Sequence, residues 1–557
     1  MQPKSLPVLA ILAALAACAG LPGGGAVPGG APRPPEALLA DGDAALERNE
    51  LPEAARAYRQ AAEASDDETI AEQATRTSFD HFQMGEAALA AERWLALNPT
   101  SEQALRYAGV AALELHRLDV AERHFAQLLG SGAYISPAAG FLALLPVLSE
   151  HGTAPDVTEL FRRLVARYPE VAEGHHALGS AALRSDNFAL ALSSARRATE
   201  LAKYWVPARM LLARALVAAG DQQAGLDAAR DLVMAADADV ATHLEYALML
   251  AATGRFEEAR AMLTPYAAGD TVVPGAVRSL GVLDLDRGDL DAATQRFEDL
   301  LSTGSQSYEA LYFLGSIADR RGDEERALRY YSRVAGGDYA LAAQGRVARI
   351  KAQQSGLEAG LRHLEEYARG HPQLGPQLVA TRAGLATALD DPARAMAILD
   401  AGLAQYPDSL DLRMSRVFAY ERRGDADAAV RDLRQLLRDR PGDATVQNAL
   451  GYTLADHDRS LDEAHALIAA ALAQTPDNAA VLDSMGWVLF RQGRLPEALE
   501  HLARADALGD DPEIDLHLGE VQWAQGEREA ARATWQRALD AYPNDTRLKE
   551  RLERTQP

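Results

Sequence analysis

Small apolar residues recur at a fixed spacing along most of this chain, and polar or turn-forming residues separate them. Gly486 and Ala498 stand twelve residues apart, and Gly519 and Ala531 repeat that offset in the next stretch. The period of about 34 residues continues from about residue 36 to residue 548. Alanine is abundant and β-branched residues are sparse, which favours helix. The pattern predicts antiparallel helix pairs whose small residues let the two axes approach closely.

Each unit is placed by one anchor residue, at the eighth position of its first helix and small where the chain allows it. The anchors are Gly42, Thr75, Gly109, Leu145, Gly179, Ala213, Ala247, Gly281, Gly315, Ala348, Ala383, Val417, Gly451, Gly486 and Gly519. Thr75, Leu145 and Val417 are placed by neighbouring signals. Units four, ten and eleven are degenerate, so the count of about fifteen units is good to one or two.

Residues that end helices mark the boundaries inside and between units. A glycine seven residues after the anchor supplies the positive φ that ends the first helix. These glycines are Gly220, Gly254, Gly288, Gly322, Gly424, Gly493 and Gly526. A proline at offset twenty-four separates successive units in many places. These prolines are Pro99, Pro169, Pro372, Pro407, Pro441 and Pro543.

This pattern resembles the tetratricopeptide repeat, whose period is about 34 residues. The resemblance implies an all-α fold: a right-handed tetratricopeptide α-solenoid superhelix of about fifteen helix pairs, with a concave and a convex surface. The array is expected over residues 36–548, and fifteen units should make more than one superhelical turn. The polar tail, residues 549–557, is expected to form a cap over the last unit.

The N-terminus has the pattern of a secreted lipoprotein. Lys4 precedes an apolar run, residues 6–17, which is shorter than the roughly 20 residues needed to span a bilayer. The run ends in Leu-Ala-Ala-Cys, which resembles a bacterial lipobox with Cys18 as the lipidated residue. We therefore expect a signal peptide at 1–17 and a lipidated Gly/Pro-rich tether at 18–35. An ordinary cleaved signal peptide with a chance cysteine is the alternative.

The residue after that cysteine, Ala19, is not the aspartate that retains such lipoproteins in the inner membrane. By that resemblance, the protein is expected at the outer membrane, lipid-anchored and facing the periplasm. The formal net charge of −24 makes nucleic-acid binding an unexpected role, because phosphate neutralisation needs clustered Lys and Arg. With one cysteine, the body of the chain forms no internal disulfide.

A search for catalytic and metal-binding motifs finds none. No phosphate-binding loop, nucleophile elbow or zinc-protease motif occurs, and the thirteen histidines are scattered. Histidine pairs eight residues apart, such as His116 and His124, are expected to straddle turns or helix ends. We therefore expect a non-enzymatic protein without a metal or cofactor.

The remaining candidate site is a protein-binding surface. In tetratricopeptide units, positions 2, 5, 9 and 12 of the first helix tend to line the concave groove. Transferring that geometry predicts a partner-binding set at Phe418, Asn448, Tyr452, Asp483, Trp487, Phe490 and Trp523. Aromatic residues at interfaces often carry most of the binding energy. The alternative is that neighbouring helices cover these side chains.

The last third of the chain narrows the resemblance further. The stretch NALGYTLADHDRSLDEAHALIAAALAQTPDNAAVLDSMGWVLFRQGRLPEALEHL and the later HLGEVQWAQGEREAARATWQRAL resemble tetratricopeptide outer-membrane lipoproteins of Gram-negative bacteria. This family includes the lipoprotein binding partner of a periplasmic carboxyl-terminal processing protease. The resemblance implies an adaptor that binds and activates the protease and recruits its substrates, among them cell-wall hydrolases.

The alternative is a structural lipoprotein scaffold in an envelope export or pilus assembly machine. Self-association, stoichiometry and the identity of the partner stay open at this point.

Overall fold

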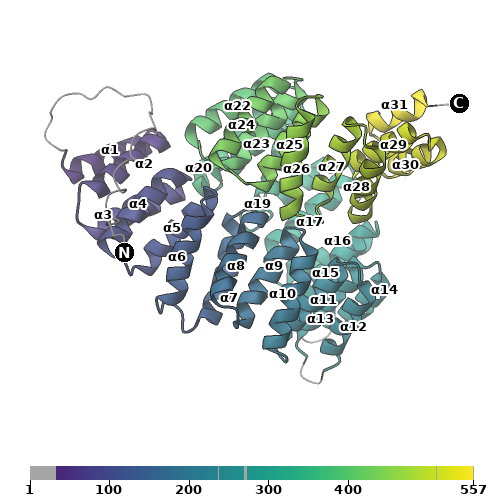
Figure 1. The fold of residues 1–557 in the computed structure, drawn as a ribbon, viewed down its shortest axis with the longest axis horizontal. Coiled ribbons are helices and arrows are strands. Elements are labelled where there is room, and N and C mark those ends of the chain that lie inside the picture. The colour runs from purple at the N-terminus through teal and green to yellow at the C-terminus, as the bar shows by residue number, and fades with distance from the viewer. Residues whose placement is uncertain (1–32, 236–237, 269–271, 510, 556–557) are drawn as a thin grey trace, which may run out of the picture.

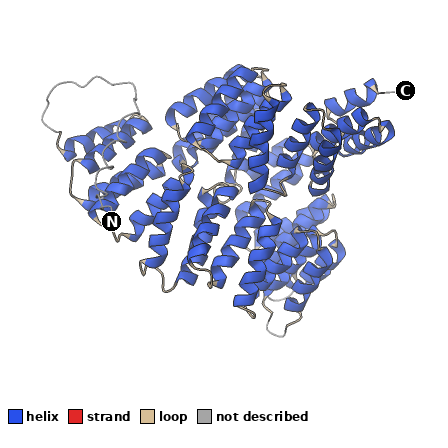
Figure 2. Ribbon diagram, in the orientation of Figure 1, coloured by secondary structure: helices blue, strands red, loops and turns tan. Residues whose placement is uncertain are grey.

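The computed structural model describes residues 33–235, 238–268, 272–509 and 511–555. Within these ranges all regular structure is helical, with thirty-one α-helices and one short 3-10 turn, Pro372–Leu374 (Figure 2). This confirms the predicted all-α solenoid of about fifteen helix pairs. The expected signal peptide, Cys18 and most of the expected tether lie outside the described residues.

Each of the fifteen units contributes a first and a second helix. The first helices are α1 (Pro35–Glu47), α3 (Glu68–Asp80), α5 (Glu102–Glu114), α7 (Pro137–His151), α9 (Ala172–Arg184), α11 (Val206–Ala218), α13 (Val240–Ala252), α15 (Pro274–Asp286), α17 (Ser307–Arg320), α19 (Ala340–Ser355), α21 (Gly375–Ala388), α23 (Leu410–Arg422), α25 (Ala444–Asp456), α27 (Ala479–Arg491) and α29 (Pro512–Gln525). The second helices are α2 (Leu51–Glu63), α4 (Met84–Leu97), α6 (Leu118–Gly130), α8 (Ala154–Arg167), α10 (Phe188–Leu201), α12 (Gln222–Val233), α14 (Phe256–Ala267), α16 (Leu290–Ser302), α18 (Glu324–Tyr331), α20 (Leu357–Gly370), α22 (Pro392–Gln405), α24 (Ala426–Asp439), α26 (Leu461–Gln474), α28 (Leu495–Leu508) and α30 (Arg528–Ala541). A last helix, α31 (Thr546–Arg554), packs on α30 and buries Leu548.

The anchor glycines hold the two helices of a unit together by making room for a large side chain. A methyl group at Gly109 would lie 2.7 Å from the ring of Phe125, and one at Gly281 would lie 2.8 Å from Phe297. Each ring belongs to the second helix of the same unit, sixteen residues after its glycine. Fully burying such a ring contributes about 1.5–3 kcal/mol of stability. A side chain at the anchor would occupy the same space as the ring, so the helix pair needs glycine there.

The predicted turn glycines have the backbone conformation expected of them. All seven have positive φ, between 71° and 92°. Units without glycine at this position keep the same left-handed turn with another residue. Those residues are Asn49, Phe82, His116, Asp186, Asp390 and Asp458, with φ between 51° and 60°. The turn geometry is therefore common to most units, although the residue that adopts it is not.

Unit four departs from the regular pairing. Its anchor, Leu145, is half-buried, while the neighbouring Leu144 is buried. The helices α7 and α8 make little contact with each other, and α7 packs mainly against α9. A leucine at the anchor prevents the close approach that glycine or alanine allows, so this pair is splayed.

Unit nine is irregular in a way that the sequence pattern did not indicate. Its second helix, α18, ends at Tyr331 after only eight residues. The chain then passes through Gly336 and Gly337, and Gly337 has a φ of 77°. Two consecutive glycines disfavour helix, so the helix does not resume before Ala340. Beyond the break, Tyr339 stacks on Tyr312 of α17 with ring centroids 4.6 Å apart.

The array curves so that later units lie against earlier ones. Figure 1 shows α20–α26 beside α4–α9, although these segments are far apart in the sequence. We call α1–α10 the amino-terminal arm and α21–α28 the carboxy-terminal arm. Leu51 and Phe82 of the first arm belong to the same apolar cluster as Val379 and Tyr406 of the second. The line along which the arms touch, between the turns of α3–α10 and the loops after α22, α24 and α26, is called the seam.

Candidate functional site

The predicted partner-binding residues centre on a buried ion pair between α27 and α29. His517 Nδ1 lies 2.8 and 3.0 Å from the two carboxylate oxygens of Asp483, and both side chains are about 95% buried. Burial alone would lower the pKa of His517, but the charge of Asp483 and its hydrogen bond raise it overall. The pair therefore binds a proton and locks the last two units against each other.

Trp487 covers this ion pair. Its ring stacks on the imidazole of His517 with centroids 4.1 Å apart and an angle of 19° between the planes. Its indole nitrogen donates to Asp456 Oδ1 at 3.3 Å, and the Arg491 guanidinium lies 5.5 Å from the ring centre. Only 7% of Trp487 is exposed, so most of its area is used to join neighbouring units.

Tyr452 extends the same cluster into α25. Its hydroxyl donates to Glu513 Oε1 at 2.6 Å, and its ring lies 6.3 Å from that of His517. Burial, followed by the nearby charge of Glu513, raises the pKa of Tyr452, which keeps the phenol protonated as a donor. Helices α25, α27 and α29 thus share one polar-aromatic cluster: Tyr452, Asp483, Trp487, Glu513 and His517, named here the C-terminal cluster.

The other predicted residues lie around this cluster or away from it. Phe490 is half-buried, with its ring 5.2 Å from that of Trp487. Asn448, one turn before Tyr452 on α25, has a buried side-chain oxygen with no hydrogen-bond partner among the described residues. Trp523 packs 6.0 Å from Trp535 in the last unit.

Phe418 on α23 differs from the rest of the predicted set. Its side chain is 58% exposed, and it has no ring contact with another aromatic side chain in the described part of the chain. Of the seven residues, it alone is fully open to a partner in this conformation. The role of the set in partner binding stays a prediction.

Sequence reasoning missed His517 and Glu513, which complete the cluster. The available signal was spacing, because Asp483 and His517 are 34 residues apart, about one repeat. Residues one period apart lie on adjacent first helices, and an acid and a histidine at that distance can pair. The position-based rule placed Trp487 on an open groove, whereas His517 of the next unit covers it.

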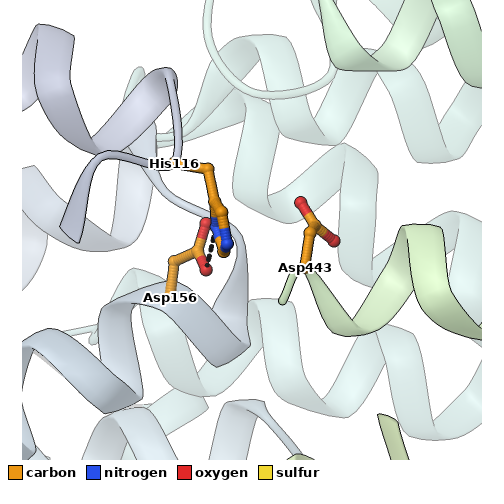
Figure 3. Close-up of side chains that lie close together, drawn as sticks. All are labelled: His116, Asp156 and Asp443. Atoms are coloured by element: carbon orange, nitrogen blue, oxygen red, sulfur yellow. Dashed lines mark ion pairs between the residues drawn. The ribbon is translucent and has the colours of Figure 1, made fainter. Parts of the chain in front are cut away.

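A second cluster of titratable groups lies at the seam. His116, Asp156 and Asp443 come from three distant segments, and their candidate ligand atoms all lie within 4.8 Å of one another (Figure 3). His116 Nδ1 is 2.8 Å from Asp156 Oδ1, in an ion pair without a well-aligned hydrogen bond. These three residues have the donor types of a metal site, so the fit has to be tested against their surroundings.

The surroundings fit an ion-pair network better than a metal. Arg440 Nε donates to Asp443 at 2.7 Å, and its Nη2 lies 3.5 Å from Asp156. The other nitrogen of His116 lies 3.0 Å from the carbonyl oxygen of Pro441. A buried guanidinium already compensates one of the two carboxylate charges, and both imidazole nitrogens face oxygen atoms of the protein. We name His116, Asp156, Arg440 and Asp443 the seam cluster.

None of the helices in the described ranges combines the length and the apolar character that crossing a membrane requires.

Family comparisons agree with the helix pairing. One tetratricopeptide-repeat model matches residues 489–552, and a second matches residues 279–345, 419–479 and 458–512. These matched stretches, together about a third of the chain, are similar to tetratricopeptide repeats. Such arrays generally serve as protein-interaction scaffolds that present an extended concave surface. This agrees with the absence of a recognised catalytic motif in the sequence.

One curated relative is similar to part of the array. Over 213 residues the chain is 35% identical to the TPR repeat-containing protein PA4667 of Pseudomonas aeruginosa strain PAO1. The matched stretch is 38% of this chain and 36% of that relative, so the likeness spans about a third of either protein.

Solved tetratricopeptide structures resemble the chain more loosely. Yeast Tom70 is 14% identical, with 91% of each chain covered and a TM-score of 0.35. A tetratricopeptide repeat protein from Parabacteroides merdae is 18% identical, covers 45% of this chain and 99% of its own, and also has a TM-score of 0.35. These likenesses carry no functional conclusion.

Proposed function

We propose that this tetratricopeptide protein is a non-enzymatic adaptor. It binds a periplasmic carboxyl-terminal processing protease, activates it, and brings it protein substrates such as cell-wall hydrolases. The observation that carries the proposal is the resemblance of residues 448–539 to outer-membrane lipoproteins with this role. The repeat array supports it, because a solenoid offers one partner surface for the protease and further surface for substrates.

The proposed location is the periplasmic face of the outer membrane. The lipobox-like Leu-Ala-Ala-Cys at residues 15–18 supports lipid anchoring at Cys18. Because the formal net charge is −24, attraction to anionic lipid would not help, and acyl chains would supply the attachment. A Cys18→Ser variant should leave the membrane fraction, which fractionation of cells expressing the full chain would measure.

The partner surface is proposed to lie on the first helices of the last units, with Phe418 as its most accessible member. Because Phe418 is 58% exposed, truncating it removes contact area without opening a core cavity. An aromatic residue at the centre of an interface typically contributes 2 kcal/mol or more, so Phe418→Ala should weaken protease binding by roughly tenfold or more. Trp487 is a poorer probe, since its truncation would also damage the fold.

The test is a pull-down from detergent-solubilised envelope, followed by a proteolysis assay with purified protease. The wild-type chain should capture the protease and accelerate cleavage of its substrate. Phe418→Ala should reduce both effects. Tyr204→Ala is the matched control, because Tyr204 is an aromatic residue that is 82% exposed in a different region.

Two results would contradict the proposal. Capture of export or pilus components without a protease would favour the structural scaffold instead. Cleavage of substrate by the purified chain alone would show that the protein is an enzyme. Equal loss with Phe418→Ala and Tyr204→Ala would remove Phe418 from the partner surface while leaving the adaptor role intact.

A further inference from the structure

The seam is built from the same pair of hydrogen bonds used twice. At the first place, the side-chain amide of Gln83 donates to the carbonyl of Gln405 at 2.7 Å, and Asp408 accepts from the backbone nitrogen of Gly85 at 3.0 Å. Gln405 is the last residue of α22, and Gly85 lies in the first turn of α4. Each arm therefore supplies a group that the helix end of the other arm needs.

The second place repeats this exchange between α26 and α10. Asn187 donates its side-chain amide toward the carbonyl of Gln474 at 3.5 Å, and Asp477 accepts from the backbone nitrogen of Phe188 at 3.0 Å. As before, an amide side chain meets the last carbonyl of a second helix. The aspartate three residues later then caps the N-terminus of a second helix on the other arm. Two occurrences of one arrangement indicate a specific interface.

Between these two places, the seam cluster takes the position of this pair of hydrogen bonds. The loop Arg440-Pro441-Gly442-Asp443 has glycine at the position where the other loops have Asp408 and Asp477. The imidazole of His116 fills the space beside it, because a Cβ on Gly442 would lie 3.9 Å from His116 Nε2. Arg440 donates from Nη1 to the carbonyl of Glu114, the last residue of α5.

The turn residues on the amino-terminal arm support the same reading. Phe82, His116 and Asp186 adopt a left-handed conformation that disfavours residues other than glycine. Each contacts the other arm. The ring of Phe82 lies 6.1 Å from that of Tyr406, and Asp186 accepts from Asn478 Nδ2 at 2.8 Å. The left-handed turn that is common to most units therefore places these three side chains against the other arm.

The positions of its neighbours indicate the protonation state of His116. Its side chain is 6% exposed, and its two nitrogens face Asp156 Oδ1 at 2.8 Å and the Pro441 carbonyl at 3.0 Å. Both partners are oxygen atoms that can only accept, so a ring with a hydrogen on each nitrogen fits the site: Nε2 bonds the carbonyl, and Nδ1 faces the carboxylate in an ion pair. The charged groups around it are Asp156 from α8, with Asp443 and Arg440 from the loop before α25. Two carboxylates are matched by two cations only when the imidazole is protonated.

We propose that the seam is a latch that holds the two arms together while His116 carries both ring protons, and that loss of one proton lets the arms part. The unprotonated nitrogen would face a carboxylate oxygen, and the cluster would keep one uncompensated negative charge in a buried place. The device sets the distance between the arms and does not depend on which partner the array binds.

The direction of the pH dependence follows from the shift in the pKa of His116. Burial would lower the pKa of His116, but the close contact with Asp156 and its negative charge raise that pKa above its ordinary value. A raised folded-state pKa means that the contribution to closure is present below the ordinary histidine range. It is lost as the pH rises through the raised pKa.

The test measures the distance between the arms by pulsed EPR in the full chain. Spin labels are placed at Arg123→Cys on α6 and Arg431→Cys on α24, both exposed positions, in a Cys18→Ser background. The short, closed distance should dominate at about pH 6, and its population should fall by about twofold or more by about pH 9. A His116→Asn variant, which keeps a residue tolerant of the left-handed turn, should be more open and insensitive to pH.

An unchanged closed population from low to high pH would overturn the proton dependence, and so would an identical profile in His116→Asn. Circular dichroism of the variant checks that it folds. Asp156→Asn removes the same ion pair from the other side. If it too leaves the distance and its pH profile unchanged, the latch is wrong.

Discussion

The seam cluster and the C-terminal cluster contain the same kinds of charged groups, but the groups of the seam cluster come from segments much farther apart in the sequence. Each has a buried histidine–aspartate ion pair beside further polar groups. In the C-terminal cluster the paired residues, Asp483 and His517, are 34 positions apart and join neighbouring units. In the seam cluster Arg440 reaches Asp156 across 284 positions and joins the two arms. One cluster therefore stabilises a stretch of the array, whereas the other sets the shape of the whole.

The comparison shows that local chemistry does not decide the role of a buried ion pair in a solenoid. Units in such an array contact only their neighbours, so most interactions affect local stability. An interaction that crosses the seam is different, because breaking it changes the distance between the arms while leaving each unit intact. The two clusters should respond in separable ways to mutation.

The largest effect is expected from Arg440→Ala. This change leaves Asp156 and Asp443 buried without their guanidinium partner, at a cost of about 3–5 kcal/mol. The arms should separate, and small-angle X-ray scattering should show a larger radius of gyration while the helical content stays constant. Arg438→Ala, an exposed change two residues earlier on α24, is the control. A wild-type scattering curve for Arg440→Ala would contradict the role given to the seam.

Asp483→Ala should have the next largest effect and a different character. His517 would stay buried without its carboxylate partner, which costs about 2–3 kcal/mol because the imidazole can become neutral. Hydrogen–deuterium exchange should accelerate in α27 and α29, and the scattering curve should not change. Opening of the arms in this variant would mean that the two clusters are coupled.

Gly288→Ala tests a turn that takes no part in the seam. Gly288 has a φ of 76° with open space around its α-carbon, so the only penalty is backbone strain of about 1 kcal/mol. Denaturant unfolding should show that loss without a change in shape. Phe82→Gly is the variant to compare with it. The change relieves backbone strain at the turn, but it should favour separated arms because the contact between Phe82 and Tyr406 is lost.

The smallest effect is expected from pH at the C-terminal cluster. Because Asp483 raises the pKa of His517, the protonated pair contributes stability at low pH, and this contribution is lost as the pH rises through that raised pKa. Exchange rates in α29, corrected for the intrinsic effect of pH, should increase over that range. Asp483→Ala should abolish the dependence, and persistence of it there would assign the titration to another group.

Much of the fold follows from the sequence, because each unit is specified locally. A glycine such as Gly281 makes room for Phe297 sixteen residues later, and Gly288 ends the helix between them. Both ends of each relation lie within one period, where residue spacing predicts contact. The N-terminal expectations around Cys18 fall outside the described residues and stay predictions.

The seam could not be predicted in the same way. It depends on small rotations between successive units, which accumulate over about ten of them before the arms meet. The splayed fourth unit also shifts the register. His116 meets Pro441 across 325 positions, while Asp186 meets Asp477 across 291, a difference of one repeat. No periodic rule contains that shift, since it occurs where a single unit departs from the regular pairing.

An open solenoid can gain or lose a repeat during evolution with little consequence beyond its length. This array is constrained differently, because the seam pairs early units with particular later units. Removing one unit between α10 and α21 would bring Asp408 opposite a turn other than that of Gly85, and every exchange along the seam would lose its partner. The seam therefore fixes the number of repeats between the two arms. The middle units can change their surface residues without disturbing the seam, but a change in their number would disturb it.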